Sequence, residues 1–130
     1  MPIKIMKIII LDTNFLTIPF QFGLDIFKEI DELIGEEHET ATIDQVVREL
    51  ESLSKGRSNN STAARIGLEL IKKRQVKIIK TKGKNADDEI VELSNDKTIV
   101  ATNDKELINR LKNKNIKVIY LRGKSRLNMR

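Results

Sequence analysis

The sequence contains no cysteine and no tryptophan, two prolines and a single histidine. Without cysteine the chain can form no disulfide, thiolate metal site or iron–sulfur cluster, and it has no cysteine nucleophile. One histidine cannot build a histidine-rich zinc site, and it leaves one candidate for a Ser-His-Asp triad. Because His38 stands among three glutamates in residues 36–39, we expect it to be exposed and without a role. Catalytic chemistry in this chain therefore depends on carboxylates.

Long apolar runs are also lacking. The longest covers residues 8–11, far short of the roughly 20 residues that span a membrane. The first ten residues, MPIKIMKIII, contain no apolar segment closed by small residues, so no secretory signal is indicated. We expect a cytoplasmic protein without a membrane partner. The strand-like run starts directly behind Met6, which leaves Met1 and Met6 as alternative start residues.

A chain of 130 residues with 39% hydrophobic and 33% charged residues is typical of one globular domain. Apolar and polar residues alternate between strand-like and helix-like periods along the chain. We therefore expect one domain at residues 1–121, followed by a basic C-terminal tail at residues 122–130.

The charges are unevenly distributed. Residues 1–54 carry 4 Lys/Arg and 11 Asp/Glu, whereas residues 55–130 carry 20 and 8, so the two parts have net charges of −7 and +12. This asymmetry favours a polyanion partner, although a lysine-rich surface can also serve solubility alone. With only five aromatic residues, stacking on bases is expected to contribute little. The candidate RNA contacts are the cations Lys55, Arg57, Lys72, Lys73, Arg74, Lys80, Lys82 and Lys84.

Strand patterns alternate with helix patterns, which predicts a three-layer α/β/α fold around a mostly parallel sheet of about five strands. Asp44 is the expected N-cap of one helix, with Val46, Val47, Leu50 and Leu53 facing the core. The predicted strands are residues 6–11, 40–43, 76–79, 98–101 and 116–121, and the predicted helices are residues 24–34, 45–54, 62–74, 86–94 and 105–111.

Acidic residues follow the strands or begin the helices of this pattern. Open parallel sheets bind ligands beyond the carboxyl ends of their strands, where Asp12 and Asp104 are expected. Asp87 and Asp88 begin a helix, and Glu49 and Glu51 border the two sides of a buried helix stripe. Asp104 or Asn103 can instead cap the last helix, and two acids in a first helical turn suit the helix dipole. If several acids converge, oxygen ligands alone favour Mg²⁺ or Mn²⁺.

Four segments carry a family resemblance: LDTNFL at residues 11–16, VVREL at 46–50, ADDEI at 86–90 and IVATNDKEL at 99–107. In order and spacing they resemble the four acidic motifs of PIN domain nucleases. The resemblance implies a Rossmann-like sheet and an endoribonuclease that uses Mg²⁺ or Mn²⁺. The implied catalytic and metal-binding residues are Asp12, Glu49, Asp87 and Asp104, surrounded by Thr13, Asn14, Asp88, Thr102 and Asn103.

Within the family, the chain is most similar to the archaeal and eukaryotic proteins of small-subunit ribosomal RNA processing. This similarity implies ribosomal RNA as the substrate and allows a homodimer. The VapC-like toxin branch is the close alternative, and it would add a protein antitoxin as a partner.

Two other classes of protein share parts of this pattern. A receiver-type signalling domain needs an acidic pair after the first strand and an aspartate after the third, where this chain has the basic residues 80–84. The second alternative is an RNA-binding ribosome-assembly factor whose acidic centre is vestigial; the four intact acids argue against it without excluding it.

Overall fold

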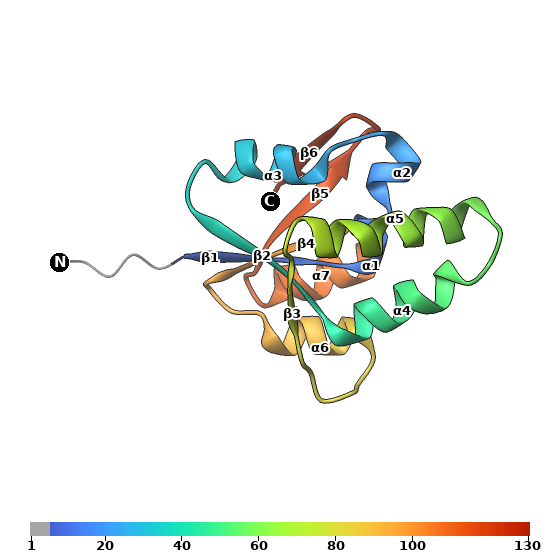
Figure 1. Ribbon diagram of the computed structural model, residues 1–130. Coiled ribbons are helices and arrows are strands. Elements are labelled where there is room, and N and C mark those ends of the chain that lie inside the picture. Colours follow the sequence, from blue (N-terminus) through green and yellow to red (C-terminus); the bar gives the residue numbers. More distant parts are fainter. Residues whose placement is uncertain (1–5) are drawn as a thin grey trace.

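The computed structural model describes residues 6–130 and forms one six-stranded sheet between two layers of helices (Figure 1). The expectation about Met1 lies outside the described residues. The strands are β1 (Lys7–Leu11), β2 (His38–Ile43), β3 (Lys77–Ile79), β4 (Thr98–Ala101), β5 (Lys117–Arg122) and β6 (Arg126–Met129). The helices are α1 (Thr13–Leu16), α2 (Ile18–Phe22), α3 (Ile26–Ile34), α4 (Asp44–Ser54), α5 (Asn59–Lys73), α6 (Ala86–Leu93) and α7 (Lys105–Asn113). None of the described helices is long and apolar enough to cross a membrane.

The strand order β3-β2-β1-β4-β5-β6 places β1 and β4 at the centre of the sheet. Strands β1 to β5 are parallel, and β6 pairs with β5 in the antiparallel sense. The chain first builds outward from β1 to β3 and then continues from β4 on the other side of β1. The strand order therefore reverses between β1 and β4, which is where open α/β sheets bind ligands.

The two helical layers follow from these connections. Figure 1 shows α3 and α5 on one face of the sheet and α6 and α7 on the other. Because both faces are covered, the central strands are buried. Five of their residues are fully inaccessible to solvent: Ile9, Ile10, Leu11, Val100 and Ala101. The predicted three-layer α/β/α fold with a mostly parallel sheet is confirmed, with six strands in place of about five.

The largest departure from the sequence pattern is at the C-terminal end. Residues 126–129, expected as part of a loose basic tail, form β6, and Leu127 is buried. The tight turn behind β5 contains Gly123 at φ 63°, a left-handed conformation that glycine adopts without strain. Only every second residue of this short strand is apolar, too weak a signal to stand out among the arginines and lysines.

Smaller corrections concern α4 and His38. Asp44 is the first residue of α4 rather than its N-cap, and its carboxylate accepts hydrogen bonds from the Thr81 backbone and hydroxyl. Leu53, expected in the core, is 42% exposed because α4 extends beyond the edge of the sheet. His38 is not exposed: its side chain is 10% accessible and its Nε2 lies 2.9 Å from Asp31 Oδ1.

Helix α5 packs closely against the segment that follows β1. A Cβ added at Gly67 would lie 2.9 Å from the carbonyl oxygen of Leu16, which is backbone and cannot swing away. This close approach of α5 holds α1 in place, and with it the residues at the start of α1.

We predict that Gly67→Ala lowers the free energy of unfolding by about 1–2 kcal/mol, because overpacking outweighs the better helix propensity of alanine. Urea denaturation measures the difference, and Glu69→Ala on the exposed side of α5 is the control. Equal stability of Gly67→Ala and the wild type would contradict the close packing of α5 on α1.

Candidate active site

Asp12 directly follows the apolar strand β1 and is 4% exposed. Its carboxylate is oriented by two short hydrogen bonds: the Thr13 backbone N–H donates to Oδ1 at 2.8 Å, and the Thr102 hydroxyl donates to Oδ2 at 2.7 Å. A buried carboxylate without such partners would be strongly destabilising. Asp12 is therefore held at the carboxyl ends of the central strands β1 and β4, where the strand order reverses.

The segment after β4 is connected to Asp12 by a network of hydrogen bonds. Thr102 Oγ1 also accepts from the Asp104 backbone N–H at 3.1 Å. The Asn14 amide donates to Asp12 Oδ2 at 3.4 Å and accepts from the Asn103 backbone N–H at 3.0 Å. These bonds fix the ends of the two central strands relative to each other.

Glu49 reaches the same place from α4. The Thr13 hydroxyl donates to Glu49 Oε2 at 2.7 Å, whereas Glu51, the alternative on the other side of the helix stripe, is exposed and lines no part of this cleft. The sequence left the choice between the two glutamates open, and the structure brings Glu49 to Asp12.

Asp104 caps α7 and also faces the cleft. Its Oδ1 accepts from the backbone N–H groups of Glu106 and Leu107, at 2.9 and 3.2 Å. The capping interpretation and the site interpretation of Asp104 are thus both compatible with its position. Asn103 does not cap the helix, because its Oδ1 accepts from the Leu121 backbone N–H at 2.7 Å.

Asp12, Glu49, Asp87 and Asp104 line one cleft of about 260 Å³. The four residues come from the end of β1, from α4, from α6 and from the start of α7. Thr13, Asn14, Gln21 and Asn60 complete most of its polar lining. Four segments that are far apart in the sequence therefore contribute one carboxylate each to a single opening.

Burial and mutual repulsion perturb these carboxylates. Burial raises the pKa of Asp12 from 3.8 to about 6; the hydrogen bonds from Thr102 and Thr13 oppose this shift, and the negative charges of Asp87 and Glu49 add to it. Burial, followed by the charge of Asp104, also raises the pKa of Asp87, and Arg110 partly offsets the effect. Converging acids with raised pKa values are typical of functional sites.

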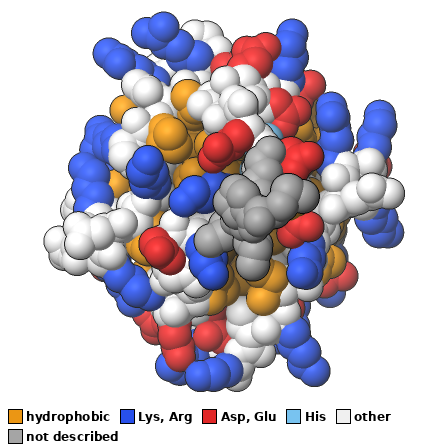
Figure 2. Space-filling view, turned by 90° about the vertical axis from the view of Figure 1, so that its left-hand side faces the viewer, with side chains coloured by type: hydrophobic (Ala, Val, Ile, Leu, Met, Phe, Trp, Pro, Cys, Tyr) orange, Lys and Arg blue, Asp and Glu red, His pale blue; other side chains and the backbone are white. Residues whose placement is uncertain are grey.

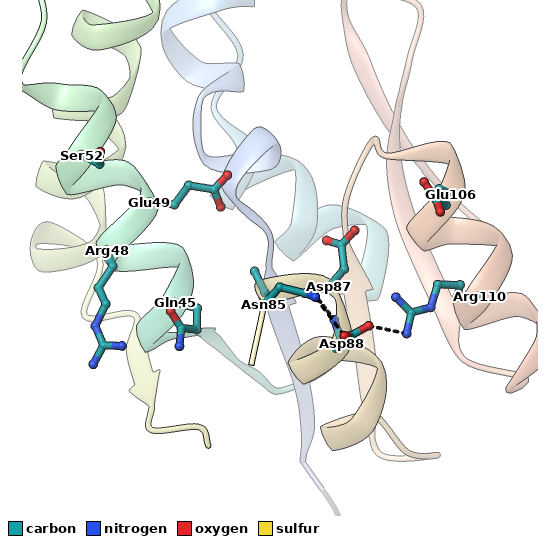
Figure 3. A pocket seen from close by; sticks show the side chains of 10 residues that line it. Gln45, Arg48, Glu49, Ser52, Asn85, Asp87, Asp88, Glu106 and Arg110 are labelled. Carbon is teal, nitrogen blue, oxygen red and sulfur yellow. Dashed lines mark hydrogen bonds and ion pairs between the residues drawn. The ribbon is translucent and has the colours of Figure 1, made fainter. Parts of the chain in front are cut away.

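A second, larger cleft of about 730 Å³ adjoins the first and shares Glu49 and Asp87 with it. Figure 3 shows both side chains pointing into the space between α4 and α6. Arg48 and Arg110 also line this cleft, together with Gln45, Ser52, Asn85 and Glu106. The sequence analysis missed these two arginines. Arg110 lies four residues after Glu106, a spacing that places both on one face of α7 and was a usable signal.

Asp88 does not join the four acids. It receives a hydrogen bond from the Asn85 amide at 2.9 Å and forms an ion pair with Arg110 at 2.8 Å, both drawn in Figure 3. Adjacent helical residues point about 100° apart, so only Asp87 can face the first cleft. Asp88, expected among the residues around the four acids, lies at the border of the acidic cleft in its ion pair with Arg110.

The predicted RNA contacts are not all at this edge of the sheet. Lys72, Lys73 and Arg74 end α5, which leads into the start of β3, and β3 is parallel to β2 and β1. These three cations therefore lie toward the opposite edge of the sheet, where Arg74 pairs with Asp25 at 3.4 Å.

The other predicted cations lie nearer to the acidic cleft. Lys55 and Arg57 lie in the turn between Leu53 and Asn60, and both flanking residues line the acidic cleft. Lys82 and Lys84 each form an ion pair with Glu92, at 3.1 and 3.0 Å. Buried Glu89 holds their loop by accepting from the backbone N–H groups of Gly83 and Lys84. Lys80 begins the same loop.

The charge asymmetry along the chain does not become a single basic patch on the face that Figure 2 shows. There, Lys and Arg side chains are interspersed with Asp and Glu side chains. Local surroundings of the clefts, rather than the charge of each half, decide where a polyanion can bind.

The acidic cleft offers oxygen atoms as ligands for a metal ion. Its carboxylate, hydroxyl and amide oxygens suit a hard cation such as Mg²⁺ or Mn²⁺, and no sulfur or imidazole competes. Within residues 6–130, however, no three Asp, Glu or His side chains are grouped closely enough to hold an ion as they stand. The residues therefore fit such an ion by chemistry, with rotation of the carboxylates toward one another.

The pKa of Asp12 generates a prediction about stability. The folded chain keeps this carboxyl protonated up to about pH 6, whereas the unfolded chain loses the proton near 3.8. The stability contributed by the protonated form is thus present in full below pH 3.8 and is lost as the pH rises through 6. Asp12→Asn removes this loss. In EDTA at pH 7.5 we expect the variant to be about 1–3 kcal/mol more stable than the wild type, at roughly 1.36 kcal/mol per pKa unit.

Chemical denaturation at several pH values measures this difference, which should shrink toward pH 4. Asp88→Asn is the control, because Asp88 is half-exposed and ion-paired. A variant less stable than the wild type at every pH would mean that ionised Asp12 is well solvated in the folded chain.

Comparison with known proteins supports the fold and the family. The family model described as "PIN like domain" matches residues 9–124. Ribonuclease VapC4 of Methanocaldococcus jannaschii is 33% identical over 119 residues, which cover 89% of this chain and 91% of that protein. The solved structure of the PIN domain endonuclease Utp24 aligns with a TM-score of 0.76 and 27% identity, covering 94% of this chain and 90% of that one.

A more distant structure shares the fold alone. VapBC2 of Rickettsia felis, solved with a DNA fragment from its promoter, aligns at a TM-score of 0.56 and 16% identity, over 88% of this chain and 99% of that one. The resemblance expected from the four acidic segments is confirmed by the family match and by VapC4 together. The chain belongs to the PIN domain nuclease family.

Proposed function

We propose that this chain is a metal-dependent endoribonuclease that hydrolyses RNA phosphodiester bonds at the cleft of Asp12, Glu49, Asp87 and Asp104. The observation that carries the proposal is the convergence of these four acids, each from a different element, on one opening at the reversal of strand order. The names of VapC4, a ribonuclease, and Utp24, an endonuclease, agree with this reaction class.

Mg²⁺ or Mn²⁺ held by these carboxylates would supply a water of lowered pKa and offset the charge of the phosphate. The chain itself supplies placement. Thr102 and Thr13 orient the Asp12 carboxylate, and Thr13 also fixes one oxygen of Glu49, leaving the other for a ligand or for the attacking water. Capping of α7 leaves only one oxygen of Asp104 for the cleft.

The phosphate backbone needs cations beside the acids, because four carboxylates repel RNA. Arg48 is exposed and lines the larger cleft next to Glu49 and Asp87, which makes it the first candidate. Lys55 and Arg57 flank the acidic cleft, and Lys80, Lys82 and Lys84 lie on the loop before α6. Phosphate contacts of this kind position a strand without reading its sequence.

The biological substrate we propose is ribosomal RNA, in the processing of the small-subunit precursor. The resemblance of the acidic segments at residues 11–16 and 86–90 to the branch of small-subunit ribosomal RNA processing supports this choice. The second candidate is a toxin ribonuclease paired with a protein antitoxin, which the 33% identity to VapC4 favours. Cytoplasmic location and a homodimer belong to the same proposal.

The decisive experiment incubates the purified chain with a small-subunit ribosomal RNA precursor and with unrelated single-stranded RNA, in Mn²⁺, Mg²⁺ or EDTA. Site-specific cleavage of the precursor supports processing, whereas broad cleavage together with growth arrest on expression supports the toxin. Binding without cleavage under every condition would indicate an assembly factor and overturn the enzymatic proposal.

The adjacent acids of α6 provide a matched pair of variants. We predict that Asp87→Asn lowers the cleavage rate by about a hundredfold or more, because a misplaced metal or water loses alignment with the phosphorus. Asp88→Asn, which removes only a partly exposed ion pair with Arg110, should lower it less than about threefold. Initial rates on a fluorescent RNA report both, and equal losses would show that Asp87 has no special role.

Metal binding is tested separately from cleavage. Mn²⁺ that binds only the folded chain should raise its melting temperature, with a larger shift at higher concentration. We expect this shift for the wild type and for Asp88→Asn, and little shift for Asp12→Asn. Differential scanning fluorimetry at pH 7.5 measures it. An equal Mn²⁺ shift in all three proteins would place the bound ion outside the proposed cleft.

A further inference from the structure

A separate pocket lies on the other side of the segment that carries Asp104. It has a volume of about 360 Å³ and opens between α7 and β5, and its lining includes Asn103, Lys105, Ile108, Asn109, Tyr120 and Arg130. None of the four acids of the active cleft lines it. Its lining combines an aromatic ring, two amides and two cations, so it differs in chemistry from the acidic cleft.

In this pocket the Arg130 side chain lies over the Tyr120 ring. The Arg130 guanidinium carbon lies 4.6 Å from the centre of the Tyr120 ring, in cation–π contact. The position of Arg130 is fixed by its backbone, which exchanges two hydrogen bonds with Val118 of β5, at 2.9 and 3.0 Å. Aromatic rings and guanidinium planes are the surfaces on which proteins stack unpaired bases.

Two amides border the same pocket. Asn103 uses Oδ1 to accept from the Leu121 backbone N–H, which leaves its NH₂ group as a donor, and Asn109 lies exposed on α7. An amide presents both a donor and an acceptor, the pattern needed to bond to the edge of a base. The pocket thus has groups for the face of a base and groups for its edge.

The charge of the pocket suits the phosphates on either side of such a base. Lys105 and Arg130 line the pocket, and none of its lining residues is acidic. Glu106, which follows Lys105, lines the cleft of about 730 Å³ and not this pocket. In the loop before α6, by contrast, Lys82 and Lys84 are both paired with Glu92.

The pocket is also coupled to the active cleft through the chain. Asn103 lines the pocket, and the next residue, Asp104, lines the cleft. The Asn103 backbone N–H donates to Asn14, whose amide donates to Asp12. A strand held in the pocket would therefore be positioned directly relative to the carboxylates.

From these observations we propose that the pocket of Tyr120, Arg130, Asn103 and Asn109 binds one unpaired nucleobase of the RNA, next to the phosphate in the acidic cleft. The proposal rests on the proposed function for the identity of the polymer. The sequence analysis expected little stacking and a basic tail at residues 122–130. Under this proposal, stacking contributes to binding, and the C-terminal residues contribute to it as an ordered strand.

Binding of a short fluorescent single-stranded RNA, measured by anisotropy in EDTA so that no cleavage occurs, tests the pocket. We expect Tyr120→Ala to raise the dissociation constant by about 5- to 100-fold, the range for loss of one stacked base, and Tyr120→Phe to restore most of the affinity. Asn109→Ala should weaken binding, whereas Asn113→Ala, one turn further along α7 and outside the pocket lining, should not.

A second substrate series replaces one base at a time with an abasic site. For the wild type, one position should weaken binding far more than the others, and Tyr120→Ala should remove that difference. If Tyr120→Ala and Asn109→Ala bind as the wild type does, or if no abasic position stands out, the pocket holds no base. If Tyr120→Ala does not fold, the Asn109 and Asn113 pair decides. A wild type that binds RNA through the pocket but never cuts it, with any divalent cation, would refute the proposed reaction and leave the pocket standing.

Discussion

The hydrogen bond from Thr102 to Asp12 connects the two central strands at the point where the chain changes direction across the sheet. It orients a carboxylate that is almost fully buried, and the same hydroxyl accepts the backbone N–H of Asp104. Without these donors, the Asp12 charge at the end of an apolar strand would be strongly unfavourable. The position of one acid and the entry into the helix that carries another thus depend on a single threonine.

The rest of the cleft is arranged around that pair. Thr13 adjoins Asp12 and reaches Glu49, so the position of α4 matters for the site as much as that of the strands. Helix α5 supports this arrangement from behind, because Gly67 allows its backbone to approach Leu16. Burial raises the pKa values of Asp12 and Asp87, and the repulsion between the acids adds to the shift. A cation or a proton relieves this repulsion.

The five parallel strands were predictable because they have strong local signals, whereas the set of four acids was indicated by the family resemblance. An Ile-rich run that stops at Asp-Thr-Asn indicates a buried strand followed by a polar site, and TIVA followed by Thr-Asn-Asp shows the same pattern. Helix periodicity alone did not decide between Glu49 and Glu51, since both border the buried stripe of α4; the family resemblance indicated Glu49, which contacts Thr13 in the structure. The β6 strand was missed because only two of its four residues are apolar, and the pocket beside Tyr120 was missed because it depends on the pairing of β6 with β5. The positions of the candidate RNA-binding cations were only partly predictable. Local charge density does not say at which end of the strands a residue such as Arg74 will lie.

The distribution of the four acids along the chain also determines when the site can first exist. A growing chain that ends before β4 has Asp12, Glu49 and Asp87 but lacks Thr102, the residue that orients Asp12. The central strand β1 then has β2 on one side only, because its other neighbour is β4. The acidic cleft therefore forms only after most of the chain has left the ribosome. A chain with this order of elements therefore passes through synthesis up to β4 without an assembled acidic site.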